Sequence, residues 1–302
     1  MGEHAAIAGT PPCAGRPAVT YRQAGDRWLL IEYGDETLDL RLNFFVLGVL
    51  SALDENPPPG LLDAAPGLRS ILLSFDPGTT ARSVLMDRLQ ALHEQQPDLP
   101  ELTLPSRRIV LPLAFDDSAT RRAVARYAST IRQDAPNTLG GGNIDYIAEQ
   151  NGLHGRDELY EAISGTDWWT AFNGFAPGLP FMFRLRGPST LSVPKYNPTR
   201  AWTPEGAVGM GGPCVAIYPV DAPGSFQLFG RTLPIYDLFG RNRVFRDDPF
   251  LVRAGDRVRF TRVEEDELLE LRRQVLEDRY TYEVEDAPLV VAEHLGNGAE
   301  LP

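Results

Sequence analysis

The feature that most constrains the fold of this chain is the loss of helical periodicity after about residue 168. From there to about residue 262, short runs of strand-forming residues such as PCVAIYPV, SFQLFGRT and DRVRFTRV alternate with turns that contain Gly and Pro. The turns recur at roughly ten-residue spacing, which is typical of a closed or nearly closed all-β unit. We therefore expect a β-barrel in the second half of the chain.

A terminal helix follows the barrel pattern. The segment VEEDELLELRRQVLED places Leu268, Leu271 and Val275 on one stripe, with acidic residues in its first turn as the helix dipole favours. We predict a domain over residues 168–280 that consists of the barrel and this helix. The acidic residues 281–302 beyond it are expected to form a flexible tail.

The first half of the chain has a different pattern, in which strand-like runs alternate with helical periodicity. RWLLIEY, RSILLSF and RRIVLPLAF are strand-like, and each is followed by apolar residues at helical spacing. The order β-α-β-α-β-α predicts a small α/β domain over residues 21–140, so that the whole chain belongs to the α+β class. Short helices near 144–164, the first capped by Asn143, form a helical connection over 141–167. The Ala-, Gly- and Pro-rich residues 1–20 are expected to be a flexible tail.

Composition and charge exclude several classes of function. The 302 residues carry a net charge of −12 and contain no block of Lys or Arg, so a nucleic-acid partner is not expected. The sequence has no run of about 18 apolar residues, so no membrane span is predicted. It also does not begin with a basic segment followed by an apolar one, so export is not predicted. Two Cys and four His, scattered along the chain, predict neither a disulfide framework nor a metal site. We expect a cytoplasmic, metal-free protein.

Several catalytic signatures are absent from the sequence. There is no GxxxxGK[ST] phosphate loop, no GxSxG elbow, no HExxH and no GxGxxG after a strand. There is also no Met-Lys pair for biotin attachment and no ATP-grasp signature. The chain is therefore expected to bind no cofactor of its own.

The stretch PKYNPTRAWTPEG holds polar side chains on rigid turns. Its three prolines fix backbone angles, so Lys195, Asn197, Arg200 and Glu205 are predicted to form a preset array. Such an array suits an anionic or strongly dipolar ligand, because preset dipoles need not reorganise. An exposed loop with two surface ion pairs is the alternative, and the residues alone leave both interpretations open. Lys195 is the only Lys among the 29 basic residues of the chain.

Four ordered stretches resemble the successive motifs of the allophanate hydrolase subunit 1 family. This family includes KipI, the B subunit of bacterial 5-oxoprolinase, and one half of the carboxyltransferase domain of urea carboxylase and urea amidolyase. The resemblance spans about residues 21–273. The four stretches are GFAPGLPFM (174–182), VPKYNPTRAWTPEGAVGMGG (193–212), CVAIYPVDAPGSFQLFGRTLPIYD (214–237) and PFLVRAGDRVRF (249–260).

The resemblance implies an N-terminal α/β domain followed by a cyclophilin-like β-barrel. It also implies a KipA-like partner (allophanate hydrolase subunit 2) and, in the urea carboxylase branch, a biotin carboxylase and a biotin carrier. In that branch, carboxybiotin supplied by the carrier gives its carboxyl group to a urea nitrogen, and ATP is used by a partner. The chain alone is therefore expected to be inactive.

The branches of the family imply three functions. The first is a subunit of a biotin-dependent carboxyltransferase or amidolyase that acts on a urea-like or amide substrate. The second is the B subunit of an ATP-dependent 5-oxoprolinase, which opens a lactam, and the third is a non-catalytic KipI-like regulatory module. KYNPTRAWTPEGAVG resembles the urea carboxylase version, whereas GFAPGLP resembles KipI-type proteins and lacks a Gly-Asp pair. A general base for a urea nitrogen is then lost from this chain unless the partner supplies it.

The matched motifs imply roles for individual residues. Lys195 and Arg200 are candidates to hold a carboxylate or a polarised carbonyl, and Glu205 is either a base or a structural partner of Arg200. Substrate-binding candidates offer an amide, a guanidinium, a hydroxyl or bare backbone: they are Asn173, Asn197, Gly211, Gly212, Arg231 and Thr232. Of these, Arg231 and Thr232 are expected to line the same cavity. His154 and Cys214 are expected to be packing residues.

Overall fold

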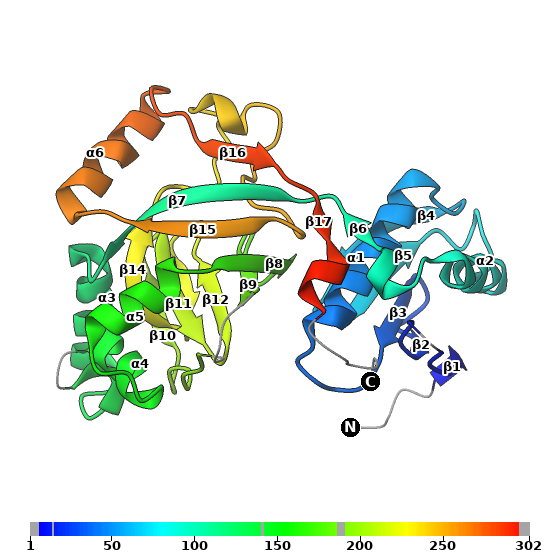
Figure 1. Cartoon of the computed structure of the whole chain (residues 1–302), viewed down its shortest axis with the longest axis horizontal. Helices are drawn as coiled ribbons and strands as arrows, with labels where there is room; N and C mark the ends of the chain where they lie inside the picture. The colour runs from blue at the N-terminus through cyan, green and yellow to red at the C-terminus, as the bar shows by residue number, and fades with distance from the viewer. Residues whose placement is uncertain (1–5, 14, 140–141, 186–190, 296–302) are drawn as a thin grey trace. The chain divides into compact units, whose positions relative to one another are not determined.

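A computed structural model of the chain describes residues 6–13, 15–139, 142–185 and 191–295 (Figure 1). The chain divides into two compact units, of which the first contains Met1–Ser106 and Ala287–Pro302 and the second contains Arg107–Asp286. The backbone therefore passes from one unit to the other twice. Each unit has its own sheets and its own buried side chains.

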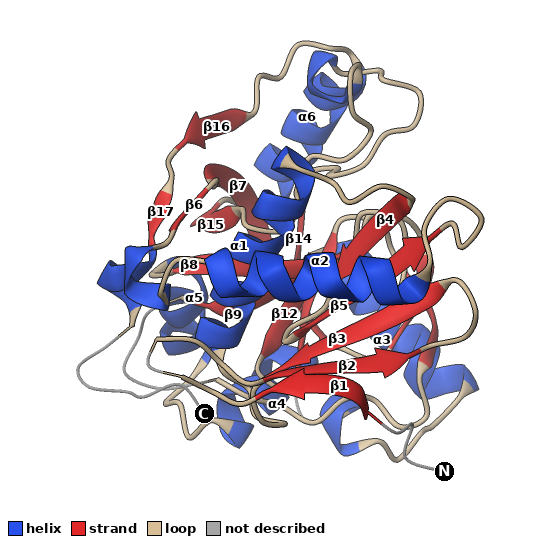
Figure 2. Cartoon of the chain, turned by 90° about the vertical axis from the view of Figure 1, so that its right-hand side faces the viewer, coloured by secondary structure: helices blue, strands red, loops and turns tan. Residues whose placement is uncertain are grey.

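The first unit is built on a five-stranded antiparallel sheet with two helices (Figure 2). Its elements are β1 Ala6–Thr10, β2 Val19–Gln23, β3 Trp28–Tyr33, α1 Leu40–Glu55, β4 Leu61–Pro66, β5 Ser70–Phe75, α2 Arg82–Gln95, β6 Thr103–Leu104 and β17 Leu289–Val290, with single turns of helix at Leu99–Glu101 and Val291–His294. The strand order is β1-β2-β3-β5-β4. A separate two-stranded sheet pairs β6 with β17, which comes from the C-terminal segment.

One face of the five-stranded sheet is buried because every second residue of its strands is apolar. In β3, Leu29, Ile31 and Tyr33 are fully buried, while their neighbours are partly exposed. Both helices cover this face, since the Tyr33 ring contacts Phe45 of α1 and His93 of α2. The predicted strands at RWLLIEY and RSILLSF and the helix after each of them are confirmed.

The predicted flexible tails are wrong where the structure describes them. Residues 6–10 form β1, which pairs with β2. At the other end, β16 (Glu283–Asp286) pairs with a strand of the second unit, and β17 pairs with β6. Edge strands are weakly marked in a sequence, because their open side tolerates polar residues. The tail predictions for residues 1–5, 14 and 296–302 lie outside the described residues.

The second unit is a closed barrel of seven strands. The strands are β7 Arg107–Phe115, β8 Asp167–Asn173, β9 Pro180–Arg184, β11 Ala207–Gly211, β12 Cys214–Ile217, β14 Gln227–Thr232 and β15 Arg257–Arg262. They pair in the order β14-β11-β12-β9-β8-β15-β7, and β7 pairs back to β14, which closes the barrel. The predicted barrel and the α+β class are confirmed.

Shorter elements surround the barrel. Strands β10 Arg200–Thr203 and β13 Ala222–Gly224 form a separate two-stranded ribbon. The helices are α3 Ser118–Thr130, α4 Asn143–Gln150, α5 Arg156–Ser164 and α6 Glu265–Leu276, with single turns at Pro136–Thr138 and Arg243–Phe245. The predicted terminal helix is confirmed as α6, which buries Leu268 and Val275.

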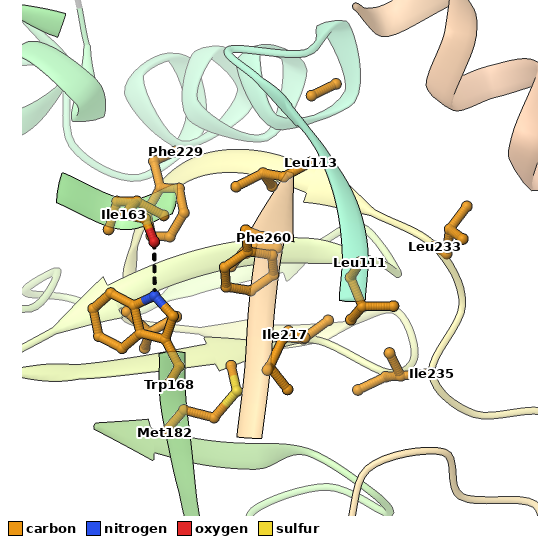
Figure 3. Packing of buried hydrophobic residues seen from close by; sticks show 14 of the residues in the cluster. Leu111, Leu113, Ile163, Trp168, Met182, Ile217, Phe229, Leu233, Ile235 and Phe260 are labelled. Atoms are coloured by element: carbon orange, nitrogen blue, oxygen red, sulfur yellow. Dashed lines mark hydrogen bonds between the residues drawn. The ribbon is translucent and has the colours of Figure 1, made fainter. Parts of the chain in front are cut away.

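Apolar side chains from all seven strands fill the barrel. Trp168, Met182, Phe229 and Phe260 are among them and lie together in Figure 3. The indole N–H of Trp168 donates a hydrogen bond to the carbonyl oxygen of Ile163, 2.9 Å away. A polar group buried without such a partner would cost about 1–3 kcal/mol. This bond therefore lets a tryptophan occupy an otherwise apolar core.

The boundary between the units lies earlier in the chain than predicted. The sequence pattern placed residues 107–115 and the following helix in an N-terminal domain over 21–140, but both belong to the barrel unit, as do α4 and α5 of the predicted connection. The reason is strand pairing: β7 runs parallel to β15 over six residue pairs and antiparallel to β14 and β16. Periodicity identifies a strand, but it does not identify the partners of that strand.

A buried histidine joins the sheet of the first unit to helix α2. The hydroxyl groups of Tyr21 and Tyr33 lie 2.9 and 2.8 Å from Nδ1 and Nε2 of His93, and Nδ1 lies 2.6 Å from the carbonyl oxygen of Leu89. Burial lowers the pKa of His93 from 6.5 to about 4. The imidazole is therefore neutral at pH 7, and the contacts fit a tautomer in which Nδ1–H donates to Leu89 and Nε2 accepts from Tyr33.

We expect the protein to lose stability on acidification from pH 6.5 to pH 4, in part through His93. The folded state keeps His93 neutral in this range while the unfolded state binds a proton, so the free energy of unfolding falls as the pH falls. The share due to His93 is about 3 kcal/mol. Urea unfolding of the wild type and of His93→Gln at a series of pH values measures this share. The difference between their free energies of unfolding should shrink toward pH 4.

The control for this measurement is Leu62→Ser, because Leu62 is 64% exposed on β4 of the same unit and neither residue titrates. Its stability relative to the wild type should stay constant over the same pH range. If the difference between the wild type and His93→Gln were equally constant, the neutral buried imidazole would be disproved.

Candidate functional site

Gly209 and Gly211 of the VGMGG stretch lie on the outer face of barrel strand β11. Val208 and Met210 point into the core, so the glycines beside them face outward by strand alternation. A Cβ on Gly211 would stand 2.6 Å from a ring carbon of Phe226. Gly211 was predicted to bind a substrate, but the space beside it is filled by Phe226. Gly212 has a positive φ of 58°, and a Cβ there would meet nothing within 4 Å.

Lys195 is exposed, and its ammonium group stands over the ring of Phe226. Nζ lies 5.3 Å from the ring centroid, within the range of a cation–π contact. The backbone next to it is fixed, because the N–H of Tyr196 donates to the carbonyl of Ser225 at 2.6 Å. No ion pair among the described residues includes Lys195. Its charge is thus available to an anionic ligand.

Asn197 lies on the same loop and is also exposed. Its carbonyl oxygen accepts a hydrogen bond from Nη1 of Arg132 at 3.0 Å. Arg132 is itself exposed and lies 3.2 Å from Asp134, which partly offsets its charge. Lys195, and Arg132 from the segment after α3, therefore bring positive charge to this loop in a chain whose net charge is −12.

Arg200 is buried, which differs from its predicted place beside a ligand. Its exposed fraction is 1%, and its guanidinium donates to the carbonyl of Phe226 at 2.6 Å and to Oγ1 of Thr203 at 3.0 Å. The guanidinium carbon lies 4.4 Å from the centroid of the Tyr196 ring. These contacts join β10, the loop of Lys195 and Phe226. Arg200 therefore positions Lys195 and is closed to a ligand.

A buried network of amides holds the same loop from its other side. Tyr196 donates from its hydroxyl to Oδ1 of Asn143 at 2.8 Å, and Gln227 donates from Nε2 to the carbonyl of Pro194 at 2.7 Å. Asn137 joins the two, since it donates to Gln227 at 2.9 Å and accepts from Asn143 at 2.7 Å. Helix α4 begins at Asn143 itself, so the predicted capping role is wrong. Sequence reasoning missed Tyr196 and Gln227, although both lie within the recognised motifs.

Glu205 lies in a separate cluster with two arginines. Its Oε2 pairs with Arg272 of α6 and lies 3.5 Å from Nη2 of Arg231. Arg231 also donates from Nε to the carbonyl of Glu205 at 2.8 Å. Burial is the main cause that lowers the pKa of Arg231, and the positive charge of Arg272 is the second. Glu205 is thus a structural partner, as one alternative proposed, but not of Arg200. Its carboxylate ties the turn before β11 to α6.

Thr232 and Asn173 both make hydrogen bonds to the main chain. Thr232 is fully buried and donates from Oγ1 to the carbonyl of Pro112 at 2.6 Å, so it does not line a cavity as predicted. Asn173 donates from Nδ2 to the carbonyl of Val252 at 2.8 Å. Its Oδ1 is buried and has no hydrogen-bond partner among the described residues. Because that oxygen is closed to solvent, the structure does not offer it to a ligand, although Asn173 was predicted to bind the substrate.

A line of aromatic rings leads from Phe172 to Lys195. Phe172 stacks on Phe181 with 4.7 Å between ring centroids, and Phe181 meets Phe226 edge to face at 6.3 Å. Motifs that are far apart in the sequence therefore meet on one outer face of the barrel. We use the term Lys195 surface for Lys195, Asn197, Gly212, Phe181 and Phe226.

Apart from Asn173 at the end of β8, the predicted site residues thus fall into two groups at opposite ends of β11. Gly212 follows the last residue of the strand, on the side of the Lys195 surface. Glu205 and Arg231 lie at its first residue, Ala207, which pairs with Arg231. Five residues of strand span about 13 Å. The structure therefore does not bring Lys195 and Glu205 into a single array.

Cys214 and His154 lie outside both groups. Cys214 is buried, and burial raises the pKa of its thiol to about 12, so its predicted packing role is confirmed. His154 is exposed and lies 3.0 Å from Glu158, so the prediction that it packs is wrong. In the described ranges, no group of three or more His, Cys, Asp or Glu side chains is placed to hold a metal ion. None of the helices in those ranges is long and apolar enough to cross a membrane.

The fold and the motifs that meet on the Lys195 surface are those of a carboxyltransferase-type barrel. The sequence model of the family described as carboxyltransferase domain, subdomain C and D, matches residues 19–245, which is most of the chain. The chain belongs to this family.

Urea-metabolising enzymes and 5-oxoprolinase subunits are both among the relatives of the chain. Urea amidolyase of Lachancea kluyveri is 33% identical over 275 residues, which is 91% of this chain and 14% of that protein. The B subunit of Bacillus subtilis 5-oxoprolinase is 26% identical over 246 residues, which is 80% of this chain and 92% of that protein. The crystal structure of Kluyveromyces lactis urea carboxylase matches with a TM-score of 0.85 and 31% identity, over 96% of this chain and 26% of that chain. The chain thus spans a small part of the urea enzymes it matches.

We expect Arg200→Ala to destabilise the protein by about 2–4 kcal/mol, because the carbonyl of Phe226 and the hydroxyl of Thr203 lose their buried partner. Lys195→Ala removes an exposed side chain without an ion pair, so it should change the free energy of unfolding by less than about 0.5 kcal/mol. Urea unfolding followed by circular dichroism measures both. An Arg200→Ala variant as stable as the wild type would mean that the guanidinium is free to hold a ligand.

Proposed function

We propose that this chain is a subunit of a biotin-dependent carboxyltransferase of the urea carboxylase group, acting on a urea-like or amide substrate with a KipA-like partner. The observation that supports it is the ammonium group of Lys195, which stands over Phe226 without an ion pair among the described residues. In a chain of net charge −12, such a cation suits a carboxylate or a polarised carbonyl. Family membership supports the reaction class.

The residues of the Lys195 surface fit a carboxylated ureido ring. The ammonium suits the carboxylate, the partly exposed ring of Phe181 offers apolar contact, and Gly212 leaves open space beside the backbone. Carboxybiotin, when a carrier domain delivers it, supplies an activated carboxyl group. In this proposal Lys195 holds that carboxylate.

The proposal assigns the general base to the partner. Glu205 was the candidate within the PKYNPTRAWTPEG stretch, but its carboxylate is tied to Arg272 and Arg231. It also lies at the end of β11 away from Lys195. A base must come within hydrogen-bond reach of the proton that it removes. For a substrate held near Lys195, Glu205 does not meet that condition.

The B subunit of a 5-oxoprolinase is the second candidate function. It is supported by length, because the B subunit of Bacillus subtilis 5-oxoprolinase is matched over 92% of its own sequence. In this case the Lys195 surface would face the lactam carbonyl, and a partner would use the ATP. The two candidates differ in substrate, so a reconstituted complex given ATP with either urea and bicarbonate or 5-oxoproline separates them.

The purified chain is expected to turn over neither urea nor 5-oxoproline by itself, because it has no carrier lysine and no recognisable nucleotide site. Activity should appear when a KipA-like subunit is added, together with a biotin carboxylase and a biotin carrier for carboxyl transfer. Phosphate release with each substrate measures it. Substrate-dependent turnover by the isolated chain would contradict the proposal.

Lys195→Met should lower kcat of the reconstituted complex by a factor of about 10² or more, because a preset cation acts mainly on charge that develops in the transition state. Assembly and melting temperature should be unchanged, since the side chain is exposed. Arg88→Met removes an exposed cation from the first unit and serves as the control. Equal rates for both variants would exclude Lys195 from the reaction.

A further inference from the structure

A cavity of about 560 Å³ lies in the first unit, against the C-terminal halves of α1 and α2. All the residues that line it fall between Gly48 and Leu104, so it belongs to this unit alone. Its volume is typical of sites for small molecules, which have about 300–1,000 Å³. None of the predicted site residues lines it, and the proposed carboxyl transfer leaves it unused.

Helix α1 ends beside this cavity in a negative pole. Its last two residues are Asp54 and Glu55, and its last turn has no basic residue. The aligned peptide dipoles place further negative charge at the same end. Neither carboxylate forms an ion pair within the described ranges. Because Glu55 lines the cavity, the cavity has a carboxylate whose charge is not compensated.

The last carbonyl groups of α1 also lack hydrogen-bond donors, for a reason visible in the sequence. Asn56 donates its N–H to the carbonyl of Ala52 at 3.1 Å, but the three residues after Asn56 are prolines, which carry no N–H. The carbonyls of Leu53, Asp54 and Glu55 accept no hydrogen bond from the described part of the chain. The end of α1 can therefore accept N–H groups from a ligand.

The end of α2 shows how this chain neutralises a helix terminus elsewhere. Nη1 of Arg16 donates to the carbonyls of His93 and Glu94, at 3.4 and 2.7 Å. A cation in this position is stabilised by the helix dipole. Among the described side chains, none does the same for α1, so an external cation is the group that this end lacks.

A buried amide supplies a second, independent acceptor. Gln96 lines the cavity and is 5% exposed. Its Nε2 lies 3.5 Å from the carbonyl of Leu92, while its Oε1 accepts no hydrogen bond from a described residue and is not sealed from solvent. A Cβ on Gly48 would stand 3.9 Å from that oxygen, which places Oε1 against α1. A polar atom held in this way favours a ligand that brings an N–H group.

Arg88 limits the charge that the ligand can carry. It also lines the cavity, but from an earlier turn of α2, seven residues before Gln95, which is about 10 Å along the helix axis. A second ammonium at that end of the cavity would meet a like charge. Leu92 and Leu104 offer apolar wall instead. The ligand is therefore expected to carry one ammonium on a short uncharged body.

We propose that this cavity binds a small organic cation, a primary monoamine, whose ammonium is held by the carboxylate of Glu55, the end of α1 and Oε1 of Gln96. A primary ammonium has three N–H donors and no acceptor. It thus matches a site made of a carboxylate, a carboxamide oxygen and unpaired main-chain carbonyls. This inference does not rest on the proposed function, because it uses no residue of the Lys195 surface.

The test uses the full-length chain and n-butylamine, with binding measured by calorimetry at constant ionic strength. Glu55→Gln should weaken binding by at least about 10-fold, because it removes the charge from the hydrogen bond. Ala91→Trp, at an exposed position of α2 that lines the cavity, should abolish binding by filling the space. Asp26→Asn removes an exposed carboxylate outside the cavity and serves as the matched control. Melting temperatures confirm that each variant is folded.

Three further probes define the class of ligand. Tetramethylammonium has the positive charge but no N–H, n-butanol has a similar shape without the charge, and putrescine carries a second ammonium. Each should bind at least about 10-fold more weakly than n-butylamine, because each lacks a property that the site selects.

The outcomes are distinct. Binding of n-butylamine that is weakened in Glu55→Gln, lost in Ala91→Trp and unchanged in Asp26→Asn supports the amine site. A wild-type chain that does not bind n-butylamine overturns it, and so does unchanged binding in Glu55→Gln. Equal binding of tetramethylammonium also overturns it, since an acidic chain attracts cations in general. Putrescine bound as tightly as n-butylamine would overturn the restriction to monoamines. The proposed function is tested separately, by turnover of the reconstituted complex.

Discussion

The barrel unit depends on the pairing of β7 with strands from the far end of its sequence. β7 runs parallel to β15 on one side and antiparallel to β14 on the other, and only this double pairing closes the sheet. Ile109, Leu111 and Leu113 of β7 are fully buried in the core that the closure creates. Without β7, both β14 and β15 would present open edges, which proteins normally cover or pair. The Lys195 surface rests on the outer side of this closed sheet, so its geometry follows from that pairing.

The elements of the fold could be predicted from the sequence, but their pairing could not. RRIVLPLAF has the apolar pattern of a buried strand, and the residues after it have the spacing of a helix. This pattern would be the same whether the two elements completed the first sheet or closed the barrel. The deciding contacts join residues of β7 to residues of β15 about 150 positions later, such as Arg108 and Arg257. Edge strands such as β1 and β16 carry a weak pattern, because only one side of each is paired. The sequence therefore predicted two domains but not the segments that belong to each.

The candidate site was predictable as a motif and less so as individual side chains. The prolines of PKYNPTR do lie in a fixed loop, and Lys195 is exposed on it. Nothing in the motif distinguishes Arg200 from Lys195, because the burial of Arg200 comes from Phe226, whose carbonyl lies 26 positions away in the chain. Glu205 likewise finds its partner Arg272 at a separation of 67 positions. The role of Gly211 also depends on Phe226. A glycine leaves space beside the backbone, and either a ligand or a packed aromatic ring can fill that space.

The two crossings of the chain between its units bear on how the protein is made. The first unit is interrupted: its last strand, β17, is separated from β6 by the whole of the second unit. A ribosome synthesises the chain from the N-terminus, so the first unit emerges early but lacks β17 until the entire barrel has been translated. The barrel, which is continuous from Arg107 to Asp286, can close before that moment. The second unit is thus able to reach its native state before the first unit, which is complete only when β17 has been synthesised.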